Sequence, residues 1–218
     1  MPAAMRRPVA SNMHTLVMAI DQSLYPQNTV ASMTNFRDVD VSTLQARYRE
    51  FKRLIPERVS VLESTIQRND GYADWKADFS IESLQRLNDW LGENATARRR
   101  EAAEIADLRR RFSAPIPIPD IDLSVLTLSL VHDAAMYLAS TFVHRYPQLE
   151  WTINLHDKLD ADFGQPILVG FVKRLQLNPV RILSTVAYAI VDGAPKPRHL
   201  VEAFQFWSQR VSPPPTVM

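Results

Sequence analysis

Two polar residues, His132 and Asp133, stand in the middle of the longest apolar stretch of the chain, residues 122–146. A histidine can serve as a general base near neutral pH. Adjacent positions on a helix point about 100° apart, so the two residues do not form a ready-made dyad. The alternative is that both are partly buried groups hydrogen-bonded to neighbouring helices. We favour this interpretation and keep the two residues as the candidate catalytic pair.

A second polar cluster lies in the segment His156–Gly164, which contains Asp157, Asp160 and Asp162. Carboxylate oxygens at this density are ligands for hard cations. The spacing lacks the glycine and the terminal glutamate of an EF-hand, and acidic loops commonly bind no ion. We therefore expect no bound metal and name these three aspartates as the candidate ligands. Together with the histidine–aspartate pair, the loop could line the cleft of a hydrolase or small-ligand protein.

The familiar catalytic and cofactor motifs are absent from the sequence. There is no cysteine, which removes thiolate nucleophiles and disulfides and fits a reducing cytosol. The chain has 5 glycines against 15 prolines and contains no phosphate-binding glycine loop. No serine-nucleophile elbow and no paired-histidine zinc motif occur. We expect no cofactor and lean against an enzyme.

The charges are balanced, with 25 Lys and Arg against 24 Asp and Glu. This balance gives no global preference for nucleic acid or for a membrane surface. Residues 96–112 are rich in arginine, but Glu101, Glu104 and Asp107 interleave with the cations. We expect a solvated helix there, and we do not expect a nucleic-acid contact.

The apolar stretch 122–146 predicts a buried central helix, because leucines and alanines recur on two of its faces. Asp120 or Asp122 is the expected N-cap, and Pro147 ends the helix. Its length of about 36 Å would also cross a membrane. We reject a membrane span because charged groups near a bilayer centre cost about 2.5–3.5 kcal/mol.

A long amphipathic helix is predicted to begin at a capping box formed by Ser42 and Gln45. Pro56 should kink or split it near Leu54, and the helix should end near Gly71. Its outer face carries charged residues that we expect in solvent: Arg47, Arg49, Glu50, Lys52, Arg53, Glu57 and Arg58. A second helix should start after the N-cap Ser80 and end at Gly92.

A proline-rich connector at 113–121 separates these helices from the central one. Beyond the central helix, residues 151–155 and 167–172 predict a two-stranded antiparallel hairpin. Asn178 and Pro179 predict the N-cap and first residue of a further helix that ends at Gly193. A last amphipathic helix should follow around 200–211, and residues 212–218 should form a loose tail.

Residues 1–32 are poorly patterned, and we expect the domain to comprise residues 33–211, with Met33 as a possible translation start. Arg6, Arg7 and the apolar run 16–20 resemble a signal peptide superficially. Asp21 breaks the run, and no small-residue cleavage site follows closely. We therefore expect a cytoplasmic protein.

Two stretches, Asp78–Leu91 and Ala135–Trp151, together with the Gly-Gln-Pro at 164–166, resemble a loose set of uncharacterised bacterial cytosolic proteins. Some members of that set resemble immunity proteins of bacterial toxin systems. Ala139 and Ser140 stand where the set has Gly-Glu. The resemblance implies no catalytic residue.

The sequence predicts an α+β fold that is predominantly helical, with six or seven helices around a central buried helix and one small antiparallel hairpin. The favoured function is a non-enzymatic module that binds another protein, in an immunity-like or regulatory role. The alternative is a hydrolase or small-ligand-binding protein with a cleft near His132, Asp133 and the acidic loop.

Overall fold

The computed structural model describes residues 36–111 and 117–213. Within them lie six α-helices and two two-stranded antiparallel sheets, which confirms the predominantly helical α+β class. The helices are α1 (Val41–Gln67), α2 (Ile81–Asn94), α3 (Ala102–Arg111), α4 (Val125–Arg145), α5 (Pro179–Val191) and α6 (His199–Ser208). The strands are β1 (Ala97–Arg99), β2 (Ile121–Leu123), β3 (Glu150–Ile153) and β4 (Pro166–Val169). The expectations for residues 1–32 and for Met33 lie outside the described residues.

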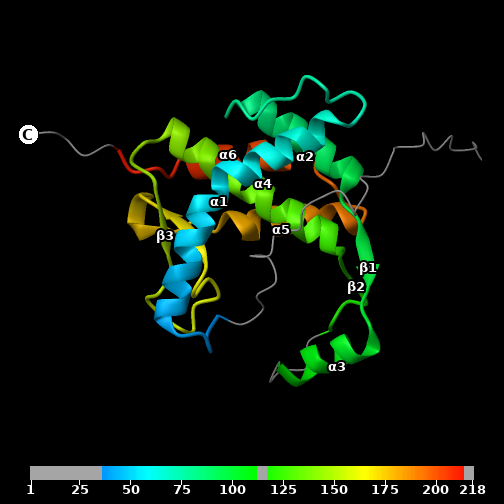
Figure 1. Cartoon of the computed structure of the whole chain (residues 1–218), viewed down its shortest axis with the longest axis vertical. Helices are drawn as coiled ribbons and strands as arrows, with labels where there is room; N and C mark the ends of the chain where they lie inside the picture. The colour runs from blue at the N-terminus through cyan, green and yellow to red at the C-terminus, as the bar shows by residue number, and fades with distance from the viewer. Residues whose placement is uncertain (1–35, 112–116, 214–218) are drawn as a thin grey trace, which may run out of the picture.

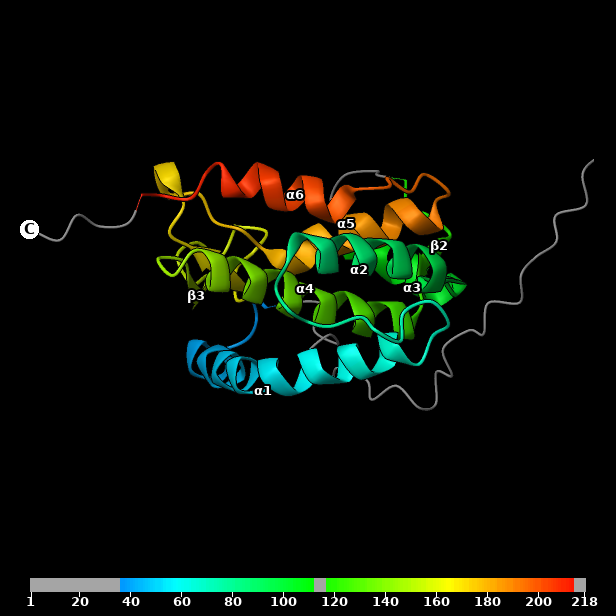
Figure 2. The same ribbon diagram turned by 90° about the horizontal axis from the view of Figure 1, so that it is seen from above.

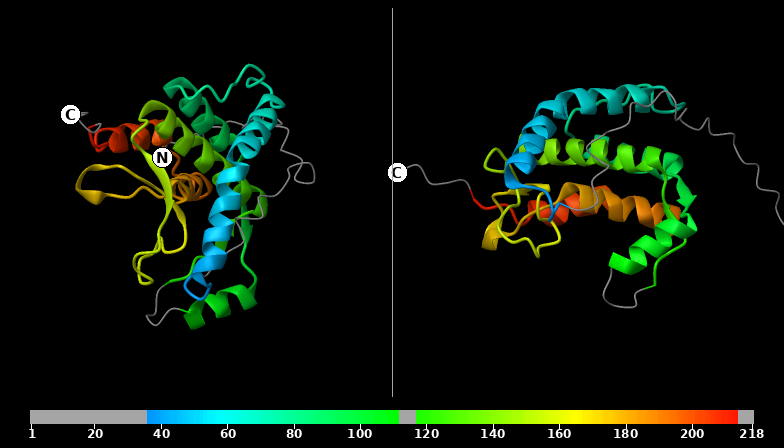
Figure 3. Two further views of the ribbon diagram at one scale, coloured as in Figure 1. Left: turned by 60° about the vertical axis from the view of Figure 1, so that its left-hand side comes forward. Right: turned by 60° about the horizontal axis from the view of Figure 1, so that its bottom comes forward.

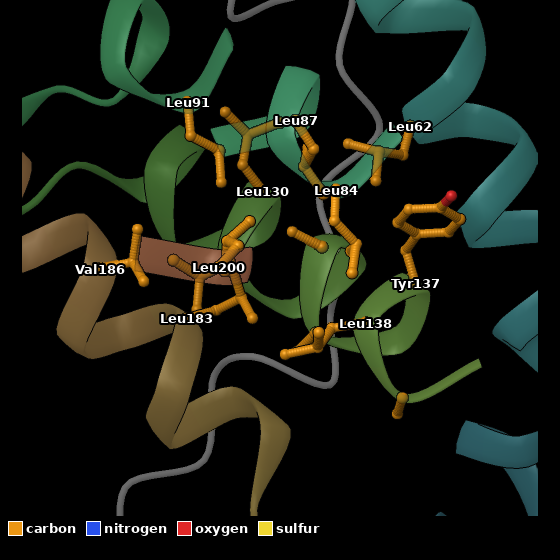
Figure 4. Packing of buried hydrophobic residues seen from close by; sticks show 14 of the residues in the cluster. Leu62, Leu84, Leu87, Leu91, Leu130, Tyr137, Leu138, Leu183, Val186 and Leu200 are labelled. Atoms are coloured by element: carbon orange, nitrogen blue, oxygen red, sulfur yellow. The ribbon is translucent and has the colours of Figure 1, made fainter. Parts of the chain in front are cut away.

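Helix α4 is the centre of the molecule, as the apolar pattern predicts. Figure 2 shows it between α1 on one side and α5 and α6 on the other. Leu130, Leu138 and Phe142 on this helix are fully buried. Figure 4 shows Leu130 and Leu138 packing among leucines from α1, α2, α5 and α6. By length and composition α4 could cross a membrane, but 78% of its most apolar stretch is buried inside the fold.

The start of α4 differs from the prediction. Ser124 is the N-cap and accepts a hydrogen bond from the Thr127 N–H, so neither Asp120 nor Asp122 has that role. The preceding residues form β2 because their backbone pairs with β1, from Ala97 opposite Leu123 onward. The connector predicted at 113–121 therefore ends in a strand, and its residues 113–116 lie outside the described part of the chain.

Helix α1 differs from the prediction at its first turn, and it stays whole at Pro56. Asp40 caps it through the Thr43 N–H, and Ser42 donates its hydroxyl hydrogen to that aspartate in place of forming a capping box. We predicted a kink or a split at Pro56, and α1 bends without splitting: it stays continuous to Gln67 (Figure 3). Residues on both sides of the proline are buried, Phe51 and Leu62 among them, so packing holds the helix together despite one missing backbone donor.

Helix α2 begins after the N-cap Ser80, as predicted, and its last turn passes Gly92. Gly92 is not the C-terminal left-handed residue, because α2 continues to Asn94. The Asn94 amide donates a hydrogen bond to the Trp90 carbonyl and is buried there. The extra turn is thus held by a side chain that fits the core.

The C-terminal half follows the predicted order. Strands β3 and β4 pair antiparallel, with Glu150 opposite Val169. Asn178 caps α5 and Pro179 is its first residue, while Gly193 ends it with φ +73°. Ser212 is not loose, because its N–H donates to the Gly170 carbonyl beside β4.

The segment 96–112 is not one helix. Its first residues form β1, and only Ala102–Arg111 form α3. Strands β1 and β2 make an unpredicted second sheet that joins α3 to the body; we call β1, α3 and β2 the arm. Figures 1 and 3 show α3 at the end of this arm, at the edge of the molecule.

Candidate functional site

Asp133 is a buried structural residue. Its side chain is fully buried in α4, and both carboxylate oxygens accept hydrogen bonds from Arg58 of α1, at 2.9 Å from Nε and 2.5 Å from Nη2. The guanidinium is also buried, so the expectation of a solvated Arg58 is wrong. A bidentate pair of this kind joins two helices and leaves no carboxylate facing a cleft.

His132 does not share a site with its neighbour. Its Nδ1 lies 2.8 Å from the Leu128 carbonyl oxygen one turn earlier, and the ring is partly buried. Burial lowers the pKa of His132, because the charged imidazolium is less well solvated there. A ring that donates to its own helix is held away from a substrate, which fits the structural interpretation of this residue.

The three aspartates of the acidic loop shape the loop itself. Asp157 accepts the Leu159 N–H, and Asp160 accepts the Asp162 N–H and the Asn154 amide. Bonds from the backbone of Asp162 and from Asn154 lower the pKa of Asp160. These carboxylates satisfy the turns of an exposed loop.

Asp162 turns toward the start of α5, where it accepts a hydrogen bond from Asn178 and pairs with Arg181 at 2.8 Å. Within residues 36–111 and 117–213, no three His, Asp or Glu side chains come together as metal ligands would. The loop therefore has hydrogen-bonding partners for its acids without a cation.

The predicted cleft between His132, Asp133 and the acidic loop is not formed. Gly164 at the end of the loop packs against Leu44 near the start of α1. Asp133 meets the same helix at Arg58, fourteen positions later, or about 20 Å along the axis. The two candidate groups thus contact well-separated parts of α1.

A pocket of about 270 Å³ lies elsewhere, between α2, α5 and the segment before α6. Its apolar lining includes Val186 and Ile190, and its polar lining includes Asp89, Lys196 and His199. The His199 Nδ1 atom is buried without a hydrogen-bond partner among the described residues. Burial, and then the charge of Lys196, lower the pKa of His199. This is a concave place for a small ligand, with one unsatisfied ring nitrogen.

The arm presents the least buried helix. No residue from Ala102 to Arg110 is buried, and Ile105 and Leu108 are only partly covered. The first turn is fixed by Glu104, which accepts the Glu101 N–H and a bidentate pair from Arg98. The bond from Arg98 lowers the pKa of Glu104 to about 2.

The base of the arm is an ionic cluster around Asp122. This carboxylate pairs with Arg98 and Arg100 and accepts the Tyr188 hydroxyl at 2.7 Å. Arg100 also donates to the Pro119 and Ile121 carbonyls. Residues 96–112 contain six arginines. Two of them, Arg98 and Arg100, hold the arm in place, a role that sequence spacing did not indicate.

Arg58 is the one buried charge that spacing could have revealed. It lies seven residues after Phe51 and four before Leu62, on the inner stripe of α1. A buried carboxylate on the central helix, such as that of Asp133, requires a paired cation.

Comparisons of the chain with protein-family models, with curated proteins and with solved structures find no match. The resemblance to immunity-like bacterial proteins therefore stays a prediction, and the function is inferred from the geometry of the chain.

Proposed function

We propose that this chain is a non-enzymatic module that binds another protein, in an immunity-like or regulatory role in the bacterial cytoplasm, and that the arm is its contact surface. One observation carries the proposal: α3 is a ten-residue helix without a buried residue from Ala102 to Arg110, displayed at the end of a two-stranded sheet.

Such an arm gains little stability from its own packing. A helix of this length is marginal in water by itself, and so is an isolated two-stranded sheet. Its order instead depends on the Arg98–Glu104 pair and on the cluster at Asp122. Burial of Ile105 and Leu108 by a partner would supply the apolar contact that α3 lacks within the described residues.

The arm also presents exposed arginine side chains that a partner could bind. Arg99 and Arg109 are exposed, and neither has an ion-pair partner among the described residues. Arginine can form bidentate bonds with carboxylates, so a partner with an acidic rim around an apolar centre fits this surface.

Affinity capture with the full chain, compared among matched variants, tests the proposal. Arg99→Glu/Arg109→Glu reverses two exposed charges on the arm. Arg47→Glu/Lys52→Glu makes the same change on the outer face of α1 and serves as the control. We expect at least one protein from the native host to be retained by wild type and control and lost by the arm variant.

Hydrogen exchange on the purified complex should then show slower exchange of the α3 amides than in the free chain. Equal capture by the arm variant and the control, or unchanged α3 exchange in the complex, would count against the arm as the contact surface.

A second candidate function is small-ligand binding at the pocket beside α2 and α5, favoured by the unpartnered His199 Nδ1. An enzyme or carrier would place a polar ligand atom against this nitrogen. Screening of metabolites by thermal unfolding tests it, with His199→Phe as the variant that should abolish any ligand-induced stabilisation.

A further inference from the structure

An exposed turn after β4 holds two consecutive charged residues in a backbone conformation that favours glycine. Lys173 and Arg174 have φ values of 55° and 56°, and both side chains are exposed. Left-handed backbone costs stability for any residue with a Cβ, and glycine would hold the same turn without strain. The turn therefore displays two cations where its backbone favours glycine. Strained backbone positions of this kind cluster at functional sites.

The turn is continuous with the end of α6. The Val172 N–H donates to the Arg210 carbonyl at 2.8 Å, and Phe171 forms a β-bridge with Val211. Arg210 in turn stacks over the ring of Phe206, 3.5 Å from its centroid. A third cation thus lies beside the two on the turn.

These cations lie in stretches of sequence without acids. No Asp or Glu occurs in residues 164–191 or 203–218. Among the described residues, Lys173, Arg174 and Arg210 have no carboxylate partner. The nearby strand β3 carries one acid, Glu150, which lies opposite Val169 of β4. Burial, and then the charge of Glu150, raise the pKa of Tyr48 on α1. The local charge is positive in a chain whose overall charge is balanced.

Apolar side chains stand among the cations. Leu175 is 38% exposed and Phe206 is 51% exposed. Phe206 packs edge-on against Trp207, which is partly buried and contacts Phe171. We name this surface the basic corner: Lys173, Arg174, Leu175, Phe206 and Arg210.

We propose that the basic corner docks onto an anionic lipid surface. Cations mixed with exposed leucine and aromatic side chains are the composition of peripheral membrane contacts. The pocket described above lies beside α2, away from this turn, and a bound peptide would need a groove or a sheet edge. A protruding turn beside a helix end fits a flat surface instead.

The basic corner and the arm are separate surfaces. Figure 2 places the C-terminal end of α6 at one end of the molecule and β2 with α3 at the other. A protein partner on the arm would remain accessible while the basic corner rests on a membrane. The lipid proposal therefore does not depend on the proposed function.

Cosedimentation of the full chain with lipid vesicles tests the proposal. Vesicles of phosphatidylcholine are compared with vesicles in which about one third of the lipid is phosphatidylglycerol. We expect binding to the anionic vesicles only, weakened by added salt. Neutralising three cations near the surface should lower the partition coefficient about 100-fold, at about fivefold per charge.

The variant is Lys173→Gly/Arg174→Gly/Arg210→Gln, because glycine removes the charges and relieves the backbone of the turn. Its melting temperature should equal or exceed that of the wild type, which separates lost binding from lost folding. Arg47→Gln/Arg49→Gln/Lys52→Gln neutralises three exposed cations on α1 and should leave vesicle binding unchanged.

Leu175→Ser/Phe206→Ser keeps every charge and should weaken binding less than the triple variant does. Equal binding to neutral and anionic vesicles, no binding to either, or unchanged binding by the triple variant would each overturn the proposal. Displacement of the vesicles by an equimolar acidic peptide or single-stranded oligonucleotide would also overturn it, in favour of that polyanion.

Discussion

Removal of the Arg58 guanidinium should be among the most damaging single changes to this fold. The pair with Asp133 is almost completely buried, with side-chain exposures of 7% and 0%. Arg58→Met keeps the aliphatic volume but leaves the carboxylate on α4 without its bidentate partner. Such a change costs about 3–5 kcal/mol. For a chain of this size, that corresponds to a fall in melting temperature of about 6–20 °C.

Urea denaturation followed by tryptophan fluorescence measures this loss, because Trp75 and Trp90 are buried. Arg53→Met is the matched control: its pair with Glu50 is exposed and should cost less than about 1 kcal/mol.

The double variant Arg58→Met/Asp133→Leu adds the sharper comparison. Replacement of a buried pair by apolar side chains is often neutral or stabilising, so most of the loss should be recovered. A loss below about 1 kcal/mol for Arg58→Met, or no recovery in the double variant, would refute the view that an uncompensated buried charge is the cause.

Leu138→Ala should lower the free energy of unfolding by about 2–5 kcal/mol in urea titration, because the residue is fully buried in α4. Gly164→Ala should cost more than about 1 kcal/mol in the same assay, since φ is +75° and the new Cβ would lie 2.6 Å from that of Phe36. His132 has a pKa below the ordinary 6.5 in the folded chain, so the unfolded chain binds the proton more readily and stability falls as pH drops below about 6.5. His132→Gln should flatten that pH dependence; an unchanged slope would contradict it. Calorimetric titration of the full chain with calcium, magnesium or manganese should show no saturable binding at the 156–164 loop. A dissociation constant below about 10 μM would revive the hypothesis that this loop binds a metal.

The sequence by itself determined the elements whose signals are local. The apolar faces of 122–146 predicted the core helix, because only burial among other helices accommodates two such faces. Ser80 and the Asn178–Pro179 step marked helix starts, since capping depends on the next few residues alone. The β3–β4 hairpin followed from alternating residues on both sides of one loop.

Only the tertiary structure decided how distant residues meet. Ala97–Arg99 became a strand because β2, which begins 22 residues after Arg99, offers its backbone. This pairing overrides the helical preference of the arginine-rich segment. Pro56 stays within α1 because the halves on both sides of it are buried, which no local rule describes. Arg58 and Asp133 lie 75 positions apart, so their pairing depends on the packing of α1 against α4. For the same reason the predicted cleft does not form: that packing holds Asp133 and the acidic loop against parts of α1 that are fourteen residues apart.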